Sequence, residues 1–301
     1  MTECLDADAY TVGWIAALPH ELAAAIAVLD DVHQGVPKNW EQPETDNNYY
    51  SWGRIGTHNI VLACLPNGVY GTNPAAVVST SMLSSFPHIR VGLMVGIGAG
   101  VPGTKGDIHL GDVVISKPGS KSGGVVQWDR GQELDDGEFV RTGTLNKPPL
   151  ALLTALSGLE TKKHLRQINL GGMAQKVAES YPDFGCPAVQ DKRPKGPELL
   201  FGIIASGNKV IKNEKMRAKI VELAGPDTMC IEMEAAGLMD SFPCLVIRGI
   251  CDWADSHKND QWHNYAATTA SAAAKELLLV LNARKVEGTK KAAEVVDGMF
   301  R

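Results

Sequence analysis

The chain has 301 residues, of which 44% are hydrophobic and 21% charged, and this is enough apolar material for a large core. Its formal net charge is −5, and no run of like charges indicates a nucleic-acid partner. No apolar stretch reaches the roughly 18 residues of a membrane span, and the acidic stretch 1–9 lacks the pattern of a secretion signal, so we expect a cytoplasmic protein without a membrane partner.

Short apolar runs and helical patterns alternate along the chain. Runs rich in Val and Ile, bounded by Gly or Pro, predict buried strands over 10–17, 59–65, 91–96, 112–116, 202–205 and 244–250. Helices are predicted over 21–29, 74–84, 149–159, 214–224, 235–241 and 265–283. Asn213 can cap the 214–224 helix and Gly225 can end it. This alternation predicts a layered α/β domain.

Two segments interrupt this alternation and are expected to be surface insertions or flaps. They are 117–140, which is rich in glycine and charge, and 181–197, which holds four prolines. After residue 283 the chain becomes polar and ends in a short amphipathic stretch. We therefore expect a single domain over 1–301, with its core at about 10–283 and a docked or frayed tail over 284–301.

A glycine cluster over 96–103 directly follows one of the strand-like runs. Glycine lets backbone N–H groups approach a ligand closely, so a turn against a ligand is the favoured interpretation and a plain turn the alternative. From Gly98 onward the cluster satisfies the letters of G-x-G-x-x-G. Pro102 and the polar stretch 104–107 do not open a helix, which argues against a dinucleotide site.

Glu21 stands where the first predicted strand passes into a helix. Open α/β sheets bind their ligands at this carboxyl edge. An acid in the first helical turn also complements the helix dipole, so a purely structural role is the alternative. His20 and Glu21 lack the second histidine of H-E-x-x-H, and no zinc site is expected there.

Three further acids stand among apolar or small residues. Glu232 and Glu234 bracket Met233 and share a face if this segment is extended, which would suit the vicinal hydroxyls of a ribose. The start of an amphipathic helix with solvated acids is the alternative. Asp252 ends a buried strand, where a raised pKa would let it act as a general acid. A turn or cap residue is the alternative there.

Together and in this order, these stretches resemble the nucleoside phosphorylase and nucleosidase superfamily over roughly 10–281. The phrases 93–98, 110–114 and 125–129 are similar to a fungal, purine nucleosidase-like subgroup, whose members are sometimes fused to nucleotide-binding immune-type regions. The resemblance implies a three-layer αβα sandwich with a central mixed, twisted sheet. It also implies a homo-oligomer, either a dimer or a hexamer.

The resemblance also implies roles for individual residues. Glu21 matches the acid that activates the attacking water, and Asp252 matches the acid that protonates or hydrogen-bonds purine N7. Glu234 would hold the ribose hydroxyls. The residues implied to bind the substrate are Gly98, Ala99, Val210, Glu232, Met233 and Glu234.

Two departures from the family pattern bear on the nucleophile and on the base. Phosphorylases of this type bind phosphate with an arginine and a serine, where this chain has Met94 and Ile97. A thioether and an alkyl chain cannot hold a dianion, so phosphate is not expected to be the nucleophile. Val210 occupies the position of the aromatic that stacks on the base. Stacking would then come from another aromatic residue, with three candidates: Trp128, Trp253 and Trp262.

The leading hypothesis is a purine nucleosidase that needs neither a metal nor an organic cofactor. Water would attack the anomeric carbon through an oxocarbenium-like transition state, with carboxyl groups serving both the nucleophile and the leaving group. A phosphorylase is the second hypothesis, with phosphate held by arginines such as Arg54, Arg90 or Arg141. The third is a catalytically silent nucleoside-sensing module of a multidomain receptor.

Overall fold

The computed structural model describes residues 2–103, 107–135, 137–188, 196–256 and 260–299. Its strands are β1 Thr2–Glu3, β2 Val12–Ala16, β3 Asp31–Gln34, β4 Tyr50–Ile55, β5 His58–Cys64, β6 Val91–Gly100, β7 Val113–Ser116, β8 Val125–Gln127, β9 Gly131–Glu133, β10 Phe139–Arg141, β11 Leu199–Ser206, β12 Thr228–Glu232 and β13 Cys244–Asp252. Its α-helices are α1 Pro19–Ala27, α2 Thr72–Ser85, α3 Leu150–His164, α4 Leu170–Ser180, α5 Glu214–Ala224, α6 His263–Val280, α7 Ala283–Glu287 and α8 Ala292–Met299. Short 3-10 helices span Ala7–Ala9, Pro182–Phe184 and Ala235–Gly237.

Within the described part of the chain, eleven strands form one mixed sheet in the order β1-β3-β4-β5-β2-β6-β12-β11-β7-β13, with β8 on β11. Strand β6 pairs in parallel with β2 and β13 and antiparallel with β12. The path β6-β12-β11-β7-β13 therefore returns to β6 and closes into a small ring. This closure brings the ends of β6, β12 and β13 to one place.

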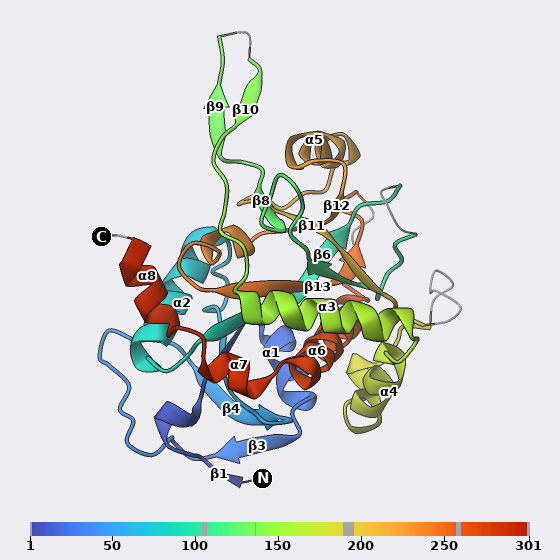
Figure 1. Cartoon of the computed structure of the whole chain (residues 1–301). Coiled ribbons are helices and arrows are strands. Elements are labelled where there is room, and N and C mark those ends of the chain that lie inside the picture. The colour runs from blue at the N-terminus through green and yellow to red at the C-terminus, as the bar shows by residue number, and fades with distance from the viewer. Residues whose placement is uncertain (1, 104–106, 136, 189–195, 257–259, 300–301) are drawn as a thin grey trace.

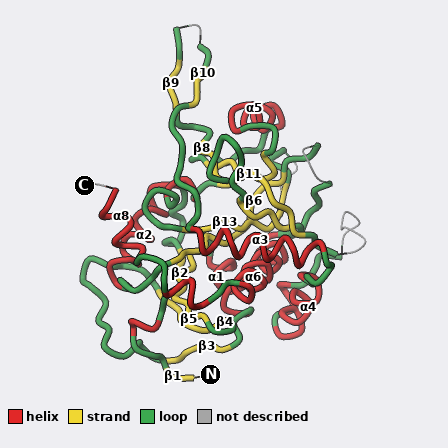
Figure 2. The backbone as a smooth tube through the Cα atoms, viewed as in Figure 1, coloured by secondary structure: helices red, strands yellow, loops and turns green. Residues whose placement is uncertain are grey.

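Helices cover both faces of the sheet (Figures 1 and 2). One core cluster joins the sheet to α1, α3, α4 and α6, and a second joins it to α2 and α8. Helix α6 is rich in alanine and approaches β13 closely, because a Cβ on Gly249 would overlap the carbonyl of Ala266. The expected three-layer αβα architecture around a mixed sheet is confirmed.

The predicted elements agree with the structure most closely where apolar periodicity is strong. All six predicted strands are present. The cap of α5 is as expected, since the amide of Met216 donates to Asn213 Oδ1 (3.0 Å) and Gly225 has a φ of 110°. The predicted helix over 235–241 is wrong, because only a 3-10 turn forms there.

The first predicted insertion, 117–140, is partly wrong. Strand β8 pairs with β11 in the main sheet, and Val125 and Val126 are buried, because this short apolar stretch completes the sheet beyond β7. The rest does project, as the β9–β10 hairpin (Figure 1). In the second insertion, 181–197, residues 189–195 lie outside the described residues. The tail forms α7 and α8, and Ala292 donates its amide to the carbonyl of Ile89 (2.8 Å).

In the part of the chain that the structure describes, no helix combines the length and the apolar character that membrane crossing requires.

Candidate functional site

A cavity of about 200 Å³ opens at the carboxyl ends of β2, β6 and β13, beside the end of β12. We call it the acid pocket, because Glu21, Glu232, Glu234 and Asp252 line it together with Arg248. Its lining includes all the residues proposed as catalytic or as contacts to the sugar and base through Glu21, β6, the 210 loop and β12–β13: Glu21, Gly98, Ala99, Val210, Glu232, Met233, Glu234 and Asp252. The alternative of solvated acids at Glu232 and Glu234 is wrong, because both side chains are buried.

Glu21 sits in the first turn of α1, with its carboxylate held by the backbone. The amides of Ala17 and Leu18 donate to Oε2 (2.7 and 2.9 Å), and the amide of Ile97 donates to Oε1 (2.7 Å). Burial raises the pKa of the Glu21 carboxyl, although the charge of Arg248 and the three amides oppose this shift. A buried carboxylate with a raised pKa and a fixed orientation is suited to take up a proton.

Arg248 is the centre of charge in the pocket and is only 1% exposed. Its Nη2 donates to Glu232 Oε2 and lies 3.5 Å from Glu234 Oε2, while Nη1 donates to the carbonyl of Ile97 (3.3 Å). Burial lowers the pKa of Arg248, but the buried carboxylates outweigh this effect and leave the pKa raised. The guanidinium therefore stays charged and balances part of the negative charge.

The two acids at the end of β12, Glu232 and Glu234, differ in their surroundings. Glu232 also accepts the amides of Glu234 (3.1 Å to Oε2) and Ala235 (3.0 Å to Oε2). Burial raises the pKa of Glu234 to about 7, with Arg248 opposing the shift and the other carboxylates adding to it. Glu232 thus secures the arginine and the following turn, and Glu234 is the acid with acceptor capacity left for a ligand.

Residues 96–100 of the glycine cluster lie in β6, and its last part forms a turn at Pro102 and Gly103. The expectation of a turn at Gly98 is therefore wrong. The glycines serve close packing, since a Cβ on Gly96 would overlap the Glu21 carboxylate and the Arg248 guanidinium. A Cβ on Gly98 would overlap the thiol of Cys230 on β12. Without side chains at these positions, β6 can lie directly against the acids.

Asp252 ends β13 and is 4% exposed. Its Oδ1 accepts the amide of Ala254 (2.8 Å), and the thiol of Cys251 lies 3.3 Å from Oδ2. One ligand atom each from Cys251, Asp252 and His263 lie within 4.8 Å of one another, a set that could hold a metal ion.

The loop that carries Val210 is anchored at both ends. Thr72, at the start of α2, donates its amide and hydroxyl to Asn208 Oδ1 (3.0 and 2.8 Å). Further along, the amide of Asn213 donates to the carbonyl of Ala254 (3.0 Å). Val210 lines the pocket and is 50% exposed, while Ile211 belongs to an apolar cluster with Ala99 and Ala254. This cluster gives the pocket an apolar wall next to Asp252.

Several lining residues did not emerge from the sequence. Arg248 is the most important, and its signal was a single charge within an apolar strand. Tyr70, Lys209 and His263 also line the pocket, and they come from loops and a helix start with no motif.

The three tryptophans considered for stacking are not part of the lining. Trp128 and Trp262 are only 3% exposed: Trp128 is buried within the apolar cluster of Ile211, and Trp262 is buried in the cluster of Tyr265. The ring of Trp253 packs against Gly100. Among the described residues, the aromatic rings that line the pocket belong to Tyr70 and His263. The expectation that one of the tryptophans faces the base is therefore not supported by their positions.

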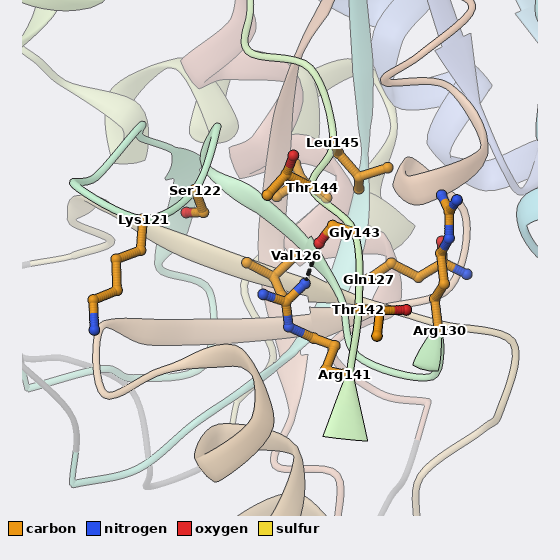
Figure 3. Close-up of a pocket in the computed structure, with 11 residues that line it drawn as sticks. Lys121, Ser122, Val126, Gln127, Arg130, Arg141, Thr142, Gly143, Thr144 and Leu145 are labelled. Carbon is orange, nitrogen blue, oxygen red and sulfur yellow. Dashed lines mark hydrogen bonds between the residues drawn. The ribbon is translucent and has the colours of Figure 1, made fainter. Parts of the chain in front are cut away.

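The arginines considered for phosphate lie elsewhere in the molecule. Arg54 donates to the carbonyl of Gly56 (2.9 Å), and Arg90 donates to the carbonyl of Thr289. Arg141 lines a small surface pocket at the base of the β9–β10 hairpin, where it donates to the carbonyl of Gly143 (2.7 Å; Figure 3).

A family model described as the phosphorylase superfamily matches residues 11–283. A nucleotide-binding leucine-rich repeat (NLR)-like protein of Hyaloscypha variabilis is 44% identical over 299 residues, covering 91% of this chain and 29% of that protein. ATP nucleosidase Cap17 of Escherichia coli is 27% identical over 276 residues, covering 85% of this chain and 48% of that protein. The chain thus spans less than half the length of these two relatives.

Among solved structures, futalosine hydrolase of Helicobacter pylori superposes with a TM-score of 0.61 at 17% identity, covering 90% of this chain and 97% of that one. This likeness shows a shared fold.

Proposed function

We propose, on the premise that the chain belongs to the phosphorylase superfamily, that it is a purine nucleosidase, which hydrolyses the bond between a purine and its ribose or deoxyribose. The observation that carries this proposal is the convergence of Glu21, Glu234 and Asp252 on one pocket around Arg248. Cleavage of an N-glycosidic bond needs groups that serve the nucleophile, the sugar and the leaving base. The acid pocket offers one acid for each task.

In the proposed mechanism, Glu21 removes a proton from a water molecule as it attacks the anomeric carbon. Its raised pKa favours this proton uptake, and positioned proton transfer typically contributes about 10² to 10⁴-fold. Glu234 accepts hydrogen bonds from the ribose hydroxyls and stabilises the positive charge that develops on the sugar. Asp252 protonates or hydrogen-bonds purine N7 as the base departs.

Water is favoured over phosphate as the nucleophile because of the charges near the pocket. Met94 is buried in the core and Ile97 lines the pocket, so the two positions that matter for phosphate offer no cation. Arg248 is the arginine in the lining, and it is already bonded to Glu232 and close to Glu234. A phosphate would have to compete with these carboxylates.

The lining of the acid pocket favours a chemical class for the base and for the 5′ group of the substrate. We place the purine against the apolar wall of Ala99, Ile211 and Ala254, beside Asp252. Because a relative is named an ATP nucleosidase and Lys209 adds a cation to the lining, a 5′-phosphorylated purine nucleoside belongs among the candidates. We further propose that residues 1–301 act as one catalytic domain, in the cytoplasm and as a homo-oligomer.

The test is a product assay with adenosine, inosine, guanosine and ATP, each with and without phosphate. Free base and ribose or its 5′-phosphorylated form, released independently of phosphate, are expected. Ribose 1-phosphate as the main product would overturn hydrolysis in favour of a phosphorylase. Substrate binding without turnover in the wild-type protein would favour the sensing module. Glu21→Gln should lower turnover by about 10² to 10⁴-fold, whereas Glu222→Gln on the exposed face of α5 should not.

A further inference from the structure

The end of β13 carries two potential metal ligands on the same side. Neighbouring residues of a regular strand point to opposite faces. Here the register of β13 against β6 shifts between Ile250 and Asp252, and such a bulge re-aims side chains. As a result, both Cys251 and Asp252 line the acid pocket, with Sγ only 3.3 Å from Oδ2.

His263 brings a third ligand from the first residue of α6. Asp260 Oδ1 lies 3.3 Å from its Nε2, which places a carboxylate beside the ring. The imidazole of His20 stacks on the His263 ring, with centroids 5.6 Å apart and an interplanar angle of 16°. The ring of His263 is therefore held in place from two sides.

The chemistry of these three ligands suits one class of metal. Thiolate, imidazole and carboxylate are the ligands of zinc sites, whereas magnesium and calcium bind almost only oxygen. Around a tetrahedral zinc ion, sulfur and nitrogen ligands stand roughly 3.5 Å apart. The ligand atoms lie within 4.8 Å of one another, so small side-chain movements would complete the shell.

We infer that Cys251, Asp252 and His263 form a zinc-binding site on the wall of the acid pocket, and that zinc bound there inhibits the enzyme. The three ligands leave the fourth position of the ion facing the cavity, where a water molecule can complete the tetrahedron. The inhibitory part rests on the proposed function, because a coordinated Asp252 cannot also serve the purine. Binding would release the thiol proton, so affinity should rise with pH.

The binding test uses the full chain and metal alone. Equilibrium dialysis should give one zinc ion per chain, and cobalt should produce a sulfur-to-cobalt charge-transfer band. Cys251→Ser and His263→Ala should abolish the band or weaken binding at least tenfold. Cys186→Ser and His164→Ala, which remove exposed side chains elsewhere, are the matched controls. No stoichiometric binding, or a cobalt spectrum without thiolate ligation in the wild-type chain, would overturn the site even if a variant failed to fold.

The inhibition test then separates this inference from the proposed function. Zinc should suppress base release by the wild-type chain, and a chelator should restore it. The residual activity of Cys251→Ser should need at least tenfold more zinc for half-inhibition. If no nucleoside is hydrolysed, the proposed function is wrong, but the cobalt spectrum still shows whether Cys251, Asp252 and His263 bind a metal ion. If zinc binds and base release is unaffected, the inhibitory role is wrong.

Discussion

The sharpest prediction concerns Arg248, whose replacement by methionine should destabilise the protein strongly. Methionine keeps much of the side-chain length and removes the charge that Glu232, Glu234 and Glu21 surround. All of these side chains are buried, so water cannot take over the role of the guanidinium.

The size of the effect follows from the geometry. With an effective dielectric constant of about 20, unit charges 3.5 Å apart, as for Arg248 and Glu234, interact by about 5 kcal/mol. Removing one partner of a buried pair typically costs about 3–5 kcal/mol, because the other charge is left unpaired. We expect a loss of this size in the free energy of unfolding at pH 8. Protonation of the carboxylates limits the loss.

The free energy of unfolding of Arg248→Met should also depend on pH. Without the arginine, the pKa values of Glu21 and Glu234 in the folded state rise further above their unfolded values, so the folded variant binds more protons than the unfolded chain. Its stability should then increase as pH falls, by about 1.4 kcal/mol per pH unit for each additional bound proton. The deficit relative to wild type should therefore shrink towards pH 5.

The assay is urea unfolding followed by tryptophan fluorescence and circular dichroism at pH 5 and pH 8. Arg141→Met, which removes an arginine whose contact is a single carbonyl, is the control and should change stability by less than about 1 kcal/mol. A free energy of unfolding for Arg248→Met within about 1 kcal/mol of the wild-type value would contradict the role of Arg248 as the balancing charge. A loss of stability that does not change with pH would contradict it as well.

Three further predictions concern the same pocket. Gly96→Ala should destabilise the protein by about 1–3 kcal/mol and lower turnover, because its Cβ would overlap the Glu21 carboxylate and the Arg248 guanidinium. The control Gly119→Ala, with open space around the new Cβ, should change neither activity nor unfolding. Because the pKa of Glu234 is raised to about 7, its ionisation opposes folding, and the free energy of unfolding of the wild type should decrease as pH rises from about 4.5 to 7. Glu234→Gln should flatten this profile in urea unfolding, and an unchanged slope would contradict a raised pKa at Glu234. Tyr70→Ala should raise KM about three- to tenfold through lost ring contact, while Tyr49→Ala, outside the acid pocket, should leave KM unchanged in steady-state assays.

The sequence was most informative where one local pattern dictates the structure. Apolar runs bounded by Gly or Pro predicted the strands, and Asn213 and Gly225 predicted both ends of α5. The predicted positions of Glu21 and Asp252 also agree with the structure, because an acid at a strand end is visible in the sequence.

The remaining features depended on contacts between distant segments. Glycines in β6 suggested a turn because their packing against Cys230 of β12 and against α1 cannot be seen locally. The tryptophans were predicted to stack on the base because of their large aromatic rings, but the direction of each ring is set by tertiary packing. Arg248 is a charge within an apolar strand, and a buried charge requires a partner of opposite sign. The acids over 232–234 are such partners, so this requirement could have identified Arg248 from the sequence.

The ring formed by β6 and β13 also determines when the pocket can exist during synthesis. Residues such as Gly98 and Ile250 pair although about 150 positions separate them in the chain. Such long-range closure is slow compared with local folding. A growing polypeptide at the ribosome therefore carries Glu21 long before Arg248 and Asp252 emerge, and the complete acid pocket should assemble in a single late step.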